Sequence, residues 1–278
     1  MSTLLRVAFL LTALVGFRPA SAESGVYSFN VLNHRSVALT AQYWNPILLY
    51  VRDKTGITLE LKLTRTAQEH TATAETGVYD FLYTNHFFTP EREKLGYRVI
   101  ARSAGPGIRG QIIVNPDSPI RDIRELEGKE VVFPTPDGFT GYWVPMDALV
   151  NAGVTVKRVF SGNQELSMGR VRNEEVAAAA VNSAVLENFA RRTGYNYRVL
   201  WSSAAYYDLC IMAHPRVPKE KVAAVRAALV GMAKDPQGRK ILAAGAELLK
   251  TGEPAGFVVA DNRDYESYRA FYRHTRVK

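Results

Sequence analysis

Residues 130–181, EVVFPTPDGFTGYWVPMDALVNAGVTVKRVFSGNQELSMGRVRNEEVAAAAV, alternate short apolar runs with segments of helical pattern. The apolar runs are Glu130–Phe133, Val154–Phe160 and Val176–Val181, and the helical segments are Thr140–Asn151 and Gln164–Asn173. Apolar strands that alternate with helices are typical of βαβ units, in which helices cover both faces of a mainly parallel sheet. This stretch therefore predicts an α/β fold.

The same alternation extends over most of the chain. Before this stretch, strands and helices are predicted at Tyr27–Leu32, Val37–Lys54, Ile57–Thr64, Ala67–Thr76, Val78–Tyr83, Tyr97–Ala101, Gln111–Val114 and Ile120–Glu127. After it, they are predicted at Ala184–Arg192, Tyr197–Trp201, Asp208–Ala213, from Pro218 onward and at Gln237–Leu249. We expect two short segments, Gly110–Val114 and Tyr207–Met212, to cross between two lobes.

The first 22 residues have the pattern of a secretory signal peptide. Arg6 provides a positive start, Val7–Phe17 is apolar, and Ala20-Ser21-Ala22 has the small-x-small form of a cleavage site. The apolar run has 11 residues, whereas about 20 are needed to span a bilayer; an N-terminal anchor or a buried helix is the alternative. We predict cleavage after Ala22, export to the periplasm and a mature chain of 278 − 22 = 256 residues.

Composition excludes several classes of protein. The chain has 278 residues, with 35 Lys and Arg against 27 Asp and Glu, and a single cysteine, Cys210. One cysteine excludes an intramolecular disulfide and a cysteine-based zinc cluster. The net charge of +8 becomes 8 − 2 = +6 when Arg6 and Arg18 leave with the signal peptide. Export also disfavours nucleic acid as a partner, so we expect none.

The sequence lacks the usual signatures of an enzyme or a metal site. It contains no Gly-x-Ser-x-Gly, Walker or His-Glu-x-x-His motif, and its five histidines have no metal-ligand spacing. A Gly-x-Gly-x-x-Gly match at Gly105–Gly110 leads into a strand instead of opening a helix, so it does not predict a dinucleotide site. We expect no catalytic residue, no metal and no cofactor.

Five segments of the mature chain carry motifs that occur in a fixed order. They are Tyr79–Asn85 (YDFLYTN), Gln111–Lys129 with its D-S-x-I and L-x-G-K patterns, Gly138–Pro145 (GFTGYWVP), Phe160–Gln164 (FSGNQ), and Gly256–Val259 (GFVV) with Asp264-Tyr265. In this order and spacing they resemble the phosphate/phosphite/phosphonate-binding family of periplasmic solute receptors that serve ABC transporters.

The resemblance implies two Rossmann-like α/β lobes joined by a two-segment hinge, the architecture of a type II periplasmic binding protein. The first lobe would comprise residues 23–112 and 208–278, and the second residues 113–207. It implies a monomeric receptor that encloses a small oxyanion or organophosphorus ligand and delivers it to a membrane permease. The alternative is a sensor whose closed form is presented to a membrane histidine kinase.

The resemblance also points to an anion-binding loop on the second lobe. Residues Gly138, Phe139, Thr140 and Gly141 lead from a strand into a helix, where free backbone N–H groups favour an anion. In the family this loop is rich in hydroxyl residues, whereas here Thr140 alone has one. Capping its own helix is the alternative role of Thr140.

Two further departures concern acidic residues of the family. Asn163 and Gln164 stand where phosphonate-binding relatives have a histidine and an acid, and the apolar run Ala177–Ala180 replaces another acid. Asn182 and Ser183 remain there as neutral candidates for ligand contact. A ligand ammonium would lack its counter-charge at these positions, so we expect a site that does not prefer an aminophosphonate.

On the first lobe, polar residues follow a strand end, where ligands bind in open α/β sheets. Arg65 and Arg109 are candidate bidentate partners for an oxyanion, with ordinary surface arginines as the alternative. Tyr43-Trp44 is a candidate cleft wall, with a place in the core as the alternative, and Tyr206–Asp208 is a candidate hinge or lid. The strand-end candidates for ligand contact are Tyr83, Thr84, Asn85 and His86, with a solvated loop histidine as the alternative for His86.

Overall fold

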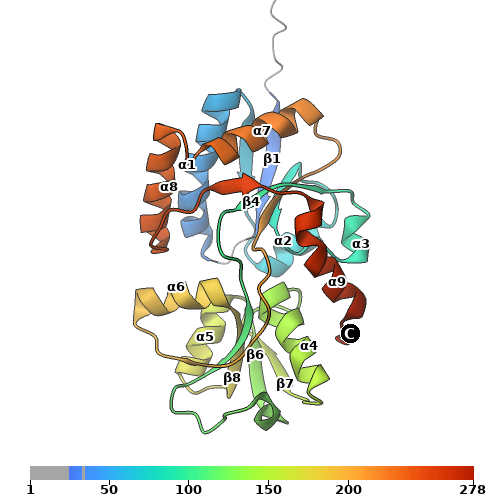
Figure 1. The fold of residues 1–278 in the computed structure, drawn as a ribbon, viewed down its shortest axis with the longest axis vertical. Coiled ribbons are helices and arrows are strands. Elements are labelled where there is room, and N and C mark those ends of the chain that lie inside the picture. The colour runs from blue at the N-terminus through green and yellow to red at the C-terminus, as the bar shows by residue number, and fades with distance from the viewer. Residues whose placement is uncertain (1–24, 33–34) are drawn as a thin grey trace, which may run out of the picture.

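The computed structural model describes residues 25–32 and 35–278, which form two α/β lobes stacked along the long axis of the molecule (Figure 1). The predicted signal peptide, residues 1–22, lies outside the described residues. None of the helices in the described ranges is long and apolar enough to cross a membrane.

The first lobe is built on a six-stranded sheet. In spatial order its strands are β11 (Phe257–Val259), β4 (Arg98–Ser103), β10 (Cys210–Ala213), β3 (Phe81–Thr84), β1 (Val26–Val31) and β2 (Thr58–Lys62). β1 pairs in parallel with β2 and β3, whereas β10 and β11 run antiparallel to their neighbours. Phe29, Phe81 and Ile211 are fully buried in the core of this lobe.

The second lobe is built on a five-stranded sheet. In spatial order its strands are β7 (Lys157–Phe160), β6 (Glu130–Phe133), β8 (Ala178–Asn182), β5 (Gly110–Val114) and β9 (Arg198–Ser202). β6 pairs in parallel with β7 and β8, and β5 is antiparallel to β8 and β9. Ile112, Val131 and Phe133 are fully buried between this sheet and its helices.

The prediction of mainly parallel sheets is wrong for β5, β10 and β11, which run against the other strands of their sheets; β5 and β10 are the strands that follow a crossing. The chain passes to the second lobe between β4 and β5 and returns between β9 and β10. A strand that enters from the other lobe runs against the parallel strands of its new sheet, and hydrophobic periodicity carries no information on strand direction. β5 lies wholly in the second sheet and β10 in the first, while the lobe limits at 112/113 and 207/208 stay a prediction.

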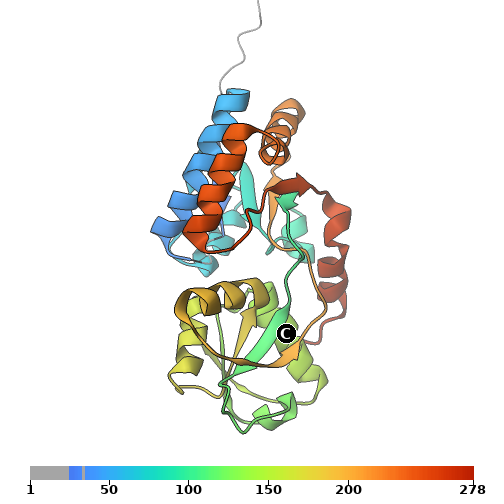
Figure 2. The same cartoon turned by 60° about the vertical axis from the view of Figure 1, so that its left-hand side comes forward.

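Helices cover both sheets. Those of the first lobe are α1 (Val37–Thr55), α2 (Ala67–Ala74), α3 (Pro90–Glu93), α7 (Lys219–Gly231), α8 (Pro236–Leu249), the 3-10 turn η3 (Asn262–Tyr265) and α9 (Glu266–His274). Those of the second are the 3-10 turn η1 (Ile123–Leu126), the π-helical turn η2 (Phe139–Trp143), α4 (Val144–Asn151), α5 (Gln164–Arg172) and α6 (Ser183–Thr193). α1 packs against α7 and α8 (Figure 2).

The helix predicted at Thr140–Asn151 begins with a wider turn than expected. The carbonyl oxygen of Gly138 accepts hydrogen bonds from the N–H groups of Tyr142 (2.8 Å) and Trp143 (3.0 Å). Gly141 lies so close to its surroundings that a Cβ there would be 2.6 Å from Pro134. The chain is therefore packed tightly where β6 leads into η2 and α4.

The C-terminal helix α9, which the sequence pattern did not predict, runs alongside both lobes (Figures 1 and 2). Beyond its end, Asp147 of α4 accepts hydrogen bonds from the Thr275 hydroxyl (2.7 Å) and the Arg276 N–H (2.9 Å). Val277 is buried in the core of the second lobe. The last residues of the chain therefore connect the first lobe to the second on the side of α9.

Candidate functional site

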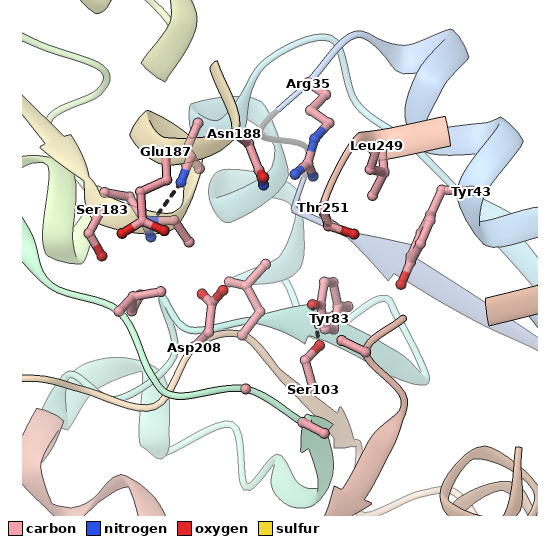
Figure 3. Close-up of a pocket in the computed structure, with 18 of the residues that line it drawn as sticks. Arg35, Tyr43, Tyr83, Ser103, Ser183, Glu187, Asn188, Asp208, Leu249 and Thr251 are labelled. Carbon is pink, nitrogen blue, oxygen red and sulfur yellow. Dashed lines mark hydrogen bonds between the residues drawn. The ribbon is translucent and has the colours of Figure 1, made fainter. Parts of the chain in front are cut away.

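A cavity of about 570 Å³ lies between the two lobes, and we call it the interlobe cavity. Its first-lobe wall comes from the segment before α1, from α1 itself, from the ends of β3 and β4, and from the loop after α8. Its second-lobe wall is one face of α6, and the two crossing segments close its floor. Figure 3 shows the side chains that point into it.

Hydroxyl groups form part of the first-lobe wall. The hydroxyls of Tyr83 and Ser103 lie 2.8 Å apart in a hydrogen bond, and Trp44 packs edge-on against Tyr83 with 4.7 Å between ring centroids. Tyr43, on the same helix as Trp44, also lines the cavity. Burial raises the pKa of both tyrosines. Their phenols therefore stay protonated at neutral pH and can donate hydrogen bonds to an anion.

Arg35 and Asp208 bring opposite charges to the same cavity (Figure 3). Oδ1 of Asp208 is buried and has no hydrogen-bond partner among the described residues. Burial raises the pKa of the Asp208 carboxyl, and the positive charge of Arg35 opposes that shift in part. The backbone carbonyl of Asp208 accepts a hydrogen bond from the Tyr265 hydroxyl (2.6 Å), which fixes this crossing segment beside η3.

The second-lobe wall begins at the start of α6. Asn182 caps this helix, because its Oδ1 accepts hydrogen bonds from the N–H groups of Ala184 (2.9 Å) and Val185 (3.3 Å). The hydroxyl of Ser183 accepts a hydrogen bond from the Arg109 N–H (3.0 Å), which joins the helix start to the first crossing. The sequence-predicted residues Asn182 and Ser183 therefore lie in the cavity wall together with Tyr83.

Two other predicted residues, Thr140 and Gln164, do not line the cavity themselves but form hydrogen bonds with Asn182, which does. The Asn182 side-chain amide donates to the Thr140 hydroxyl (3.2 Å), and its backbone N–H donates to the Gln164 side-chain oxygen (3.0 Å). Thr140 and Gln164 are both buried. They support the N-cap residue of α6, and Asn163 caps α5 by accepting from the Leu166 N–H (2.9 Å).

The predicted anion loop, Gly138–Gly141, is buried and lies outside the lining of the interlobe cavity. Phe139 occupies the hydrophobic interior between the lobes, where its ring stacks on Tyr268 with 4.0 Å between centroids. Tyr206 and Phe271 pack edge-on against the same ring. An aromatic side chain in place of a hydroxyl residue therefore joins this loop to α9.

The predicted residues Thr84, Asn85 and His86 are also buried, and none of them lines the interlobe cavity. Nδ1 of His86 lies 2.9 Å from the Thr71 hydroxyl and 3.4 Å from Oδ2 of Asp137, which belongs to the second lobe. Burial alone would raise the pKa of Asp137, but the charge of His86 and the hydroxyls nearby hold it well below its usual range. His86 and Asp137 thus face each other between the lobes, and they form an ion pair whenever the imidazole is protonated.

The two predicted arginines lie elsewhere. Arg65 is exposed on the first lobe, with its Nε 3.6 Å from Glu69. The Arg109 guanidinium donates to the backbone carbonyl of Ser203 (2.6 Å) and ties the two crossing segments together. Neither side chain lines the interlobe cavity.

Five charged residues line this cavity, and sequence reasoning named none of them as a ligand contact: Arg35, Glu187, Arg191, Asp208 and Glu253. Asp208 was predicted only as part of a hinge or lid at the second crossing, and its position there was a usable signal for the cavity as well. Asp208 and Glu187 bring carboxylates to the cavity from other segments, and these could serve as the counter-charge that a ligand ammonium was expected to lack. Within the described ranges, no group of three His, Cys, Asp or Glu side chains is placed to hold a metal ion.

Comparison with known proteins gives a consistent result. Residues 29–265 match the family model described as "ABC transporter, phosphonate, periplasmic substrate-binding protein". The chain is similar in structure to a binding protein component of an ABC phosphonate transporter from Pseudomonas aeruginosa, with 17% identity, a TM-score of 0.76, and 90% of this chain and 86% of that chain covered. None of the curated protein sequences matches it.

Two further structures resemble the chain. PhnD1 from Prochlorococcus marinus, solved in complex with methylphosphonate, has 15% identity and a TM-score of 0.75, with 89% of this chain and 97% of that chain covered. An ancestral arginine-binding protein bound to arginine has 18% identity and a TM-score of 0.54, with 79% and 97% covered. At these identities the likenesses show a shared two-lobed fold.

Proposed function

Because the chain belongs to the periplasmic phosphonate-binding family of ABC-transporter substrate-binding proteins, we propose that it binds a phosphonate in the interlobe cavity. The family consists of receptors that pass a bound solute to the membrane components of a transporter, not of enzymes. Binding and release of an unchanged ligand are therefore the function, and closure of the lobes around the ligand is the signal.

The observation that carries the proposal is the set of donors facing one another across the cavity (Figure 3). Arg35, Tyr43 and the Tyr83–Ser103 pair come from the first lobe, and Ser183 comes from the second. A phosphonate has three oxygens that accept hydrogen bonds, and charge-assisted bonds of this kind are the stronger ones. We assign its oxygens to these donors.

Asp208 has a different role in this proposal. Its carboxylate repels a fully ionised phosphonate but accepts a hydrogen bond from a ligand that still carries an acidic proton or an N–H group. The unpartnered Oδ1 is available for that bond. Asp208 would then discriminate against sulfate, which carries no proton at neutral pH.

Calorimetric titration of the mature chain, residues 23–278, tests the proposal with methylphosphonate, phosphite, phosphate, 2-aminoethylphosphonate and sulfate. We expect binding of at least one phosphonate and none of sulfate. Tyr83→Phe should weaken that binding, whereas Tyr195→Phe, which removes a buried hydroxyl with no partner among the described residues, should not. A folded protein that binds no phosphonate at all would refute the proposal.

The remaining features of the receptor are also proposals. We propose a monomer, exported to the periplasm after cleavage behind Ala22, which N-terminal sequencing of the mature protein and light scattering would check. The family match favours delivery to a permease over presentation to a sensor kinase. Stimulation of the ATPase of the cognate transporter in proteoliposomes by the liganded protein distinguishes the two.

A further inference from the structure

The chain continues for four residues beyond α9, and we call these residues, Thr275–Lys278, the C-terminal strap. The helix ends at Thr275, whose N–H donates to the carbonyl oxygen of Phe271 (2.8 Å) and whose backbone is extended. The strap therefore leaves α9 as an extended chain, and its first residue already contacts α4 of the second lobe.

A single carboxylate binds the first two residues of the strap. Oδ1 of Asp147 accepts hydrogen bonds from the Thr275 hydroxyl (2.7 Å) and the Arg276 N–H (2.9 Å). Its other oxygen, Oδ2, accepts from the side-chain amide of Asn151 (2.8 Å), one turn further along α4. Hydrogen bonds to a carboxylate are stronger than those between neutral groups. The strap is therefore held by strong polar contacts to a carboxylate that α4 itself keeps in place.

An apolar residue completes the attachment. Val277 is 9% exposed and belongs to the hydrophobic core of the second lobe. Its N–H donates to the Thr275 hydroxyl (3.2 Å). Trp143 packs against the same core and also against Tyr272 of α9, with 5.7 Å between ring centroids. Release of the strap would expose Val277 to water, so its burial favours the docked state.

The helix that carries the strap is fixed in the first lobe. Tyr268 is fully buried, and its hydroxyl donates to the backbone carbonyl of Tyr207 in the second crossing. Arg269 of α9 pairs with Glu93 of α3. Through α9 and the strap, the first lobe is therefore joined to the second at a place other than the two crossings.

The strap has little slack. Consecutive Cα atoms are about 3.8 Å apart, so Val277 can lie no more than about 7.6 Å from Thr275. One of these residues is buried in the second lobe, and the other ends a helix of the first. The lobes can therefore move apart on this side by only a few ångström while the strap is docked.

The strap and the interlobe cavity lie on different sides of the molecule. Figure 1 shows α9 on one side of the crossing segments and α6, which forms a wall of the cavity, on the other. None of the residues Thr275–Lys278 lines that cavity. A motion that opens the cavity on the α6 side is therefore compatible with a docked strap.

We propose that the C-terminal strap is a latch. Docked on α4, it holds the two lobes together on the α9 side and confines their opening to the α6 side. Released, it allows the α9 side to open as well. Rotation of two lobes about a hinge is the motion that such a contact restricts. The latch does not depend on which ligand the cavity binds, so it goes beyond the proposed function.

Distances between spin labels on the two lobes, measured by double electron–electron resonance on the mature chain without ligand, test this role. Exposed residues provide one pair on each side: Lys94 of α3 with Lys157 of β7 on the α9 side, and Leu49 of α1 with Leu166 of α5 on the α6 side (Figure 1). Each is replaced by cysteine for labelling. Cys210 is fully buried, and the chain without added cysteines checks that it takes up no label. We expect a narrow distance distribution for the α9-side pair and a broader one for the α6-side pair.

Val277→Asp should release the strap, because it places a charge in the core of the second lobe. The α9-side distribution should then broaden and shift by several ångström to longer distances. Deletion of Thr275–Lys278 should have the same effect. The matched control is Val26→Asp, since Val26 is 65% exposed on β1; it should leave both distributions unchanged.

A further variant releases the strap without placing a charge in the core. Thr275→Val combined with Arg276→Pro removes both donors to Asp147, and the extended backbone of Thr275 is compatible with a following proline. It should also broaden the α9-side distribution. The strap is not a latch if the folded variants keep the α9-side distribution of the natural chain, or if Val26→Asp broadens it equally. Because no ligand is present, either result leaves the proposed function standing.

Discussion

The substitution Asp208→Asn separates the role of this residue in binding from its cost to the fold. It preserves the size of the side chain and removes its charge. Oδ1 of Asp208 is buried in the interlobe cavity without a hydrogen-bond partner among the described residues, and burial raises the pKa of the carboxyl. An unliganded receptor therefore holds a charge that would be more stable in water.

The expected loss of affinity follows from one hydrogen bond. A hydrogen bond to a charged group contributes about 1.5–3 kcal/mol, and each 1.4 kcal/mol or so is a factor of ten in affinity. Asp208→Asn should therefore weaken the binding of a phosphonate that carries an acidic proton or an ammonium group by between about 10-fold and about 150-fold. Calorimetric titration measures this change directly.

The same substitution should have the opposite effect on the unliganded protein. Because the pKa of Asp208 is higher in the folded state than the usual value of about 3.9, its contribution to stability is present below that value and is lost as the pH rises. Asparagine avoids this loss. The melting temperature of the variant without ligand should therefore exceed that of the natural protein at pH 7, and the two should converge towards pH 4.

Asp117→Asn is a suitable control, because Asp117 is exposed on the second lobe and outside the interlobe cavity. It should change neither the affinity for a phosphonate nor the melting temperature of the unliganded protein. Two outcomes would refute this role of Asp208. One is an Asp208→Asn variant that is less stable than the natural protein at pH 7 without ligand, and the other is a variant that binds every phosphonate as tightly as the natural protein does.

Two further predictions concern the contacts between the lobes. Asp137→Asn should lower the free energy of unfolding by about 1–3 kcal/mol at pH 7. Because the pKa of Asp137 is depressed in the folded state, this loss should shrink as the pH falls below about 4. Urea unfolding at several pH values measures the loss, and a loss that does not change with pH would contradict the prediction. Phe139→Ala should cost about 3–5 kcal/mol, since the ring is 1% exposed and packs against α9; a urea midpoint equal to that of the natural protein would exclude this role.

The alternating pattern predicted the two-lobed α/β fold because burial of a strand or a helix face leaves a direct trace in the order of apolar residues. The strands Glu130–Phe133 and Val176–Val181 and the helix Gln164–Asn173 were found in this way, and β6, β8 and α5 lie there. β5 is antiparallel to β8 in the second sheet, and β10 is antiparallel to β3 in the first. These directions leave no such trace in the sequence, because the direction of a strand depends on the lobe from which the chain enters the sheet.

The site was harder to predict than the fold because its charged residues come from distant segments. Arg35 precedes α1, Asp208 lies between β9 and β10, and Glu187 is on α6, so no short motif contains them. One local signal existed for α6. Ser183, Glu187 and Arg191 are spaced by four residues, which places them on one face of the predicted helix. That face was identifiable from sequence, whereas its position opposite Arg35 required the structure.

The contents of the loop before α4 also bear on how this receptor holds an anion. The resemblance implies hydroxyl residues in this loop, Gly138–Gly141. In this chain Phe139 is packed against α9 instead, and the negative charge of Asp137 lies beside His86. The Asp137 carboxylate would repel a bound anion at this loop. The repulsion is strong because two like charges interact more strongly in a buried, low-dielectric region than in water. The phosphonate oxygens are therefore expected at Arg35 and the hydroxyls of the interlobe cavity.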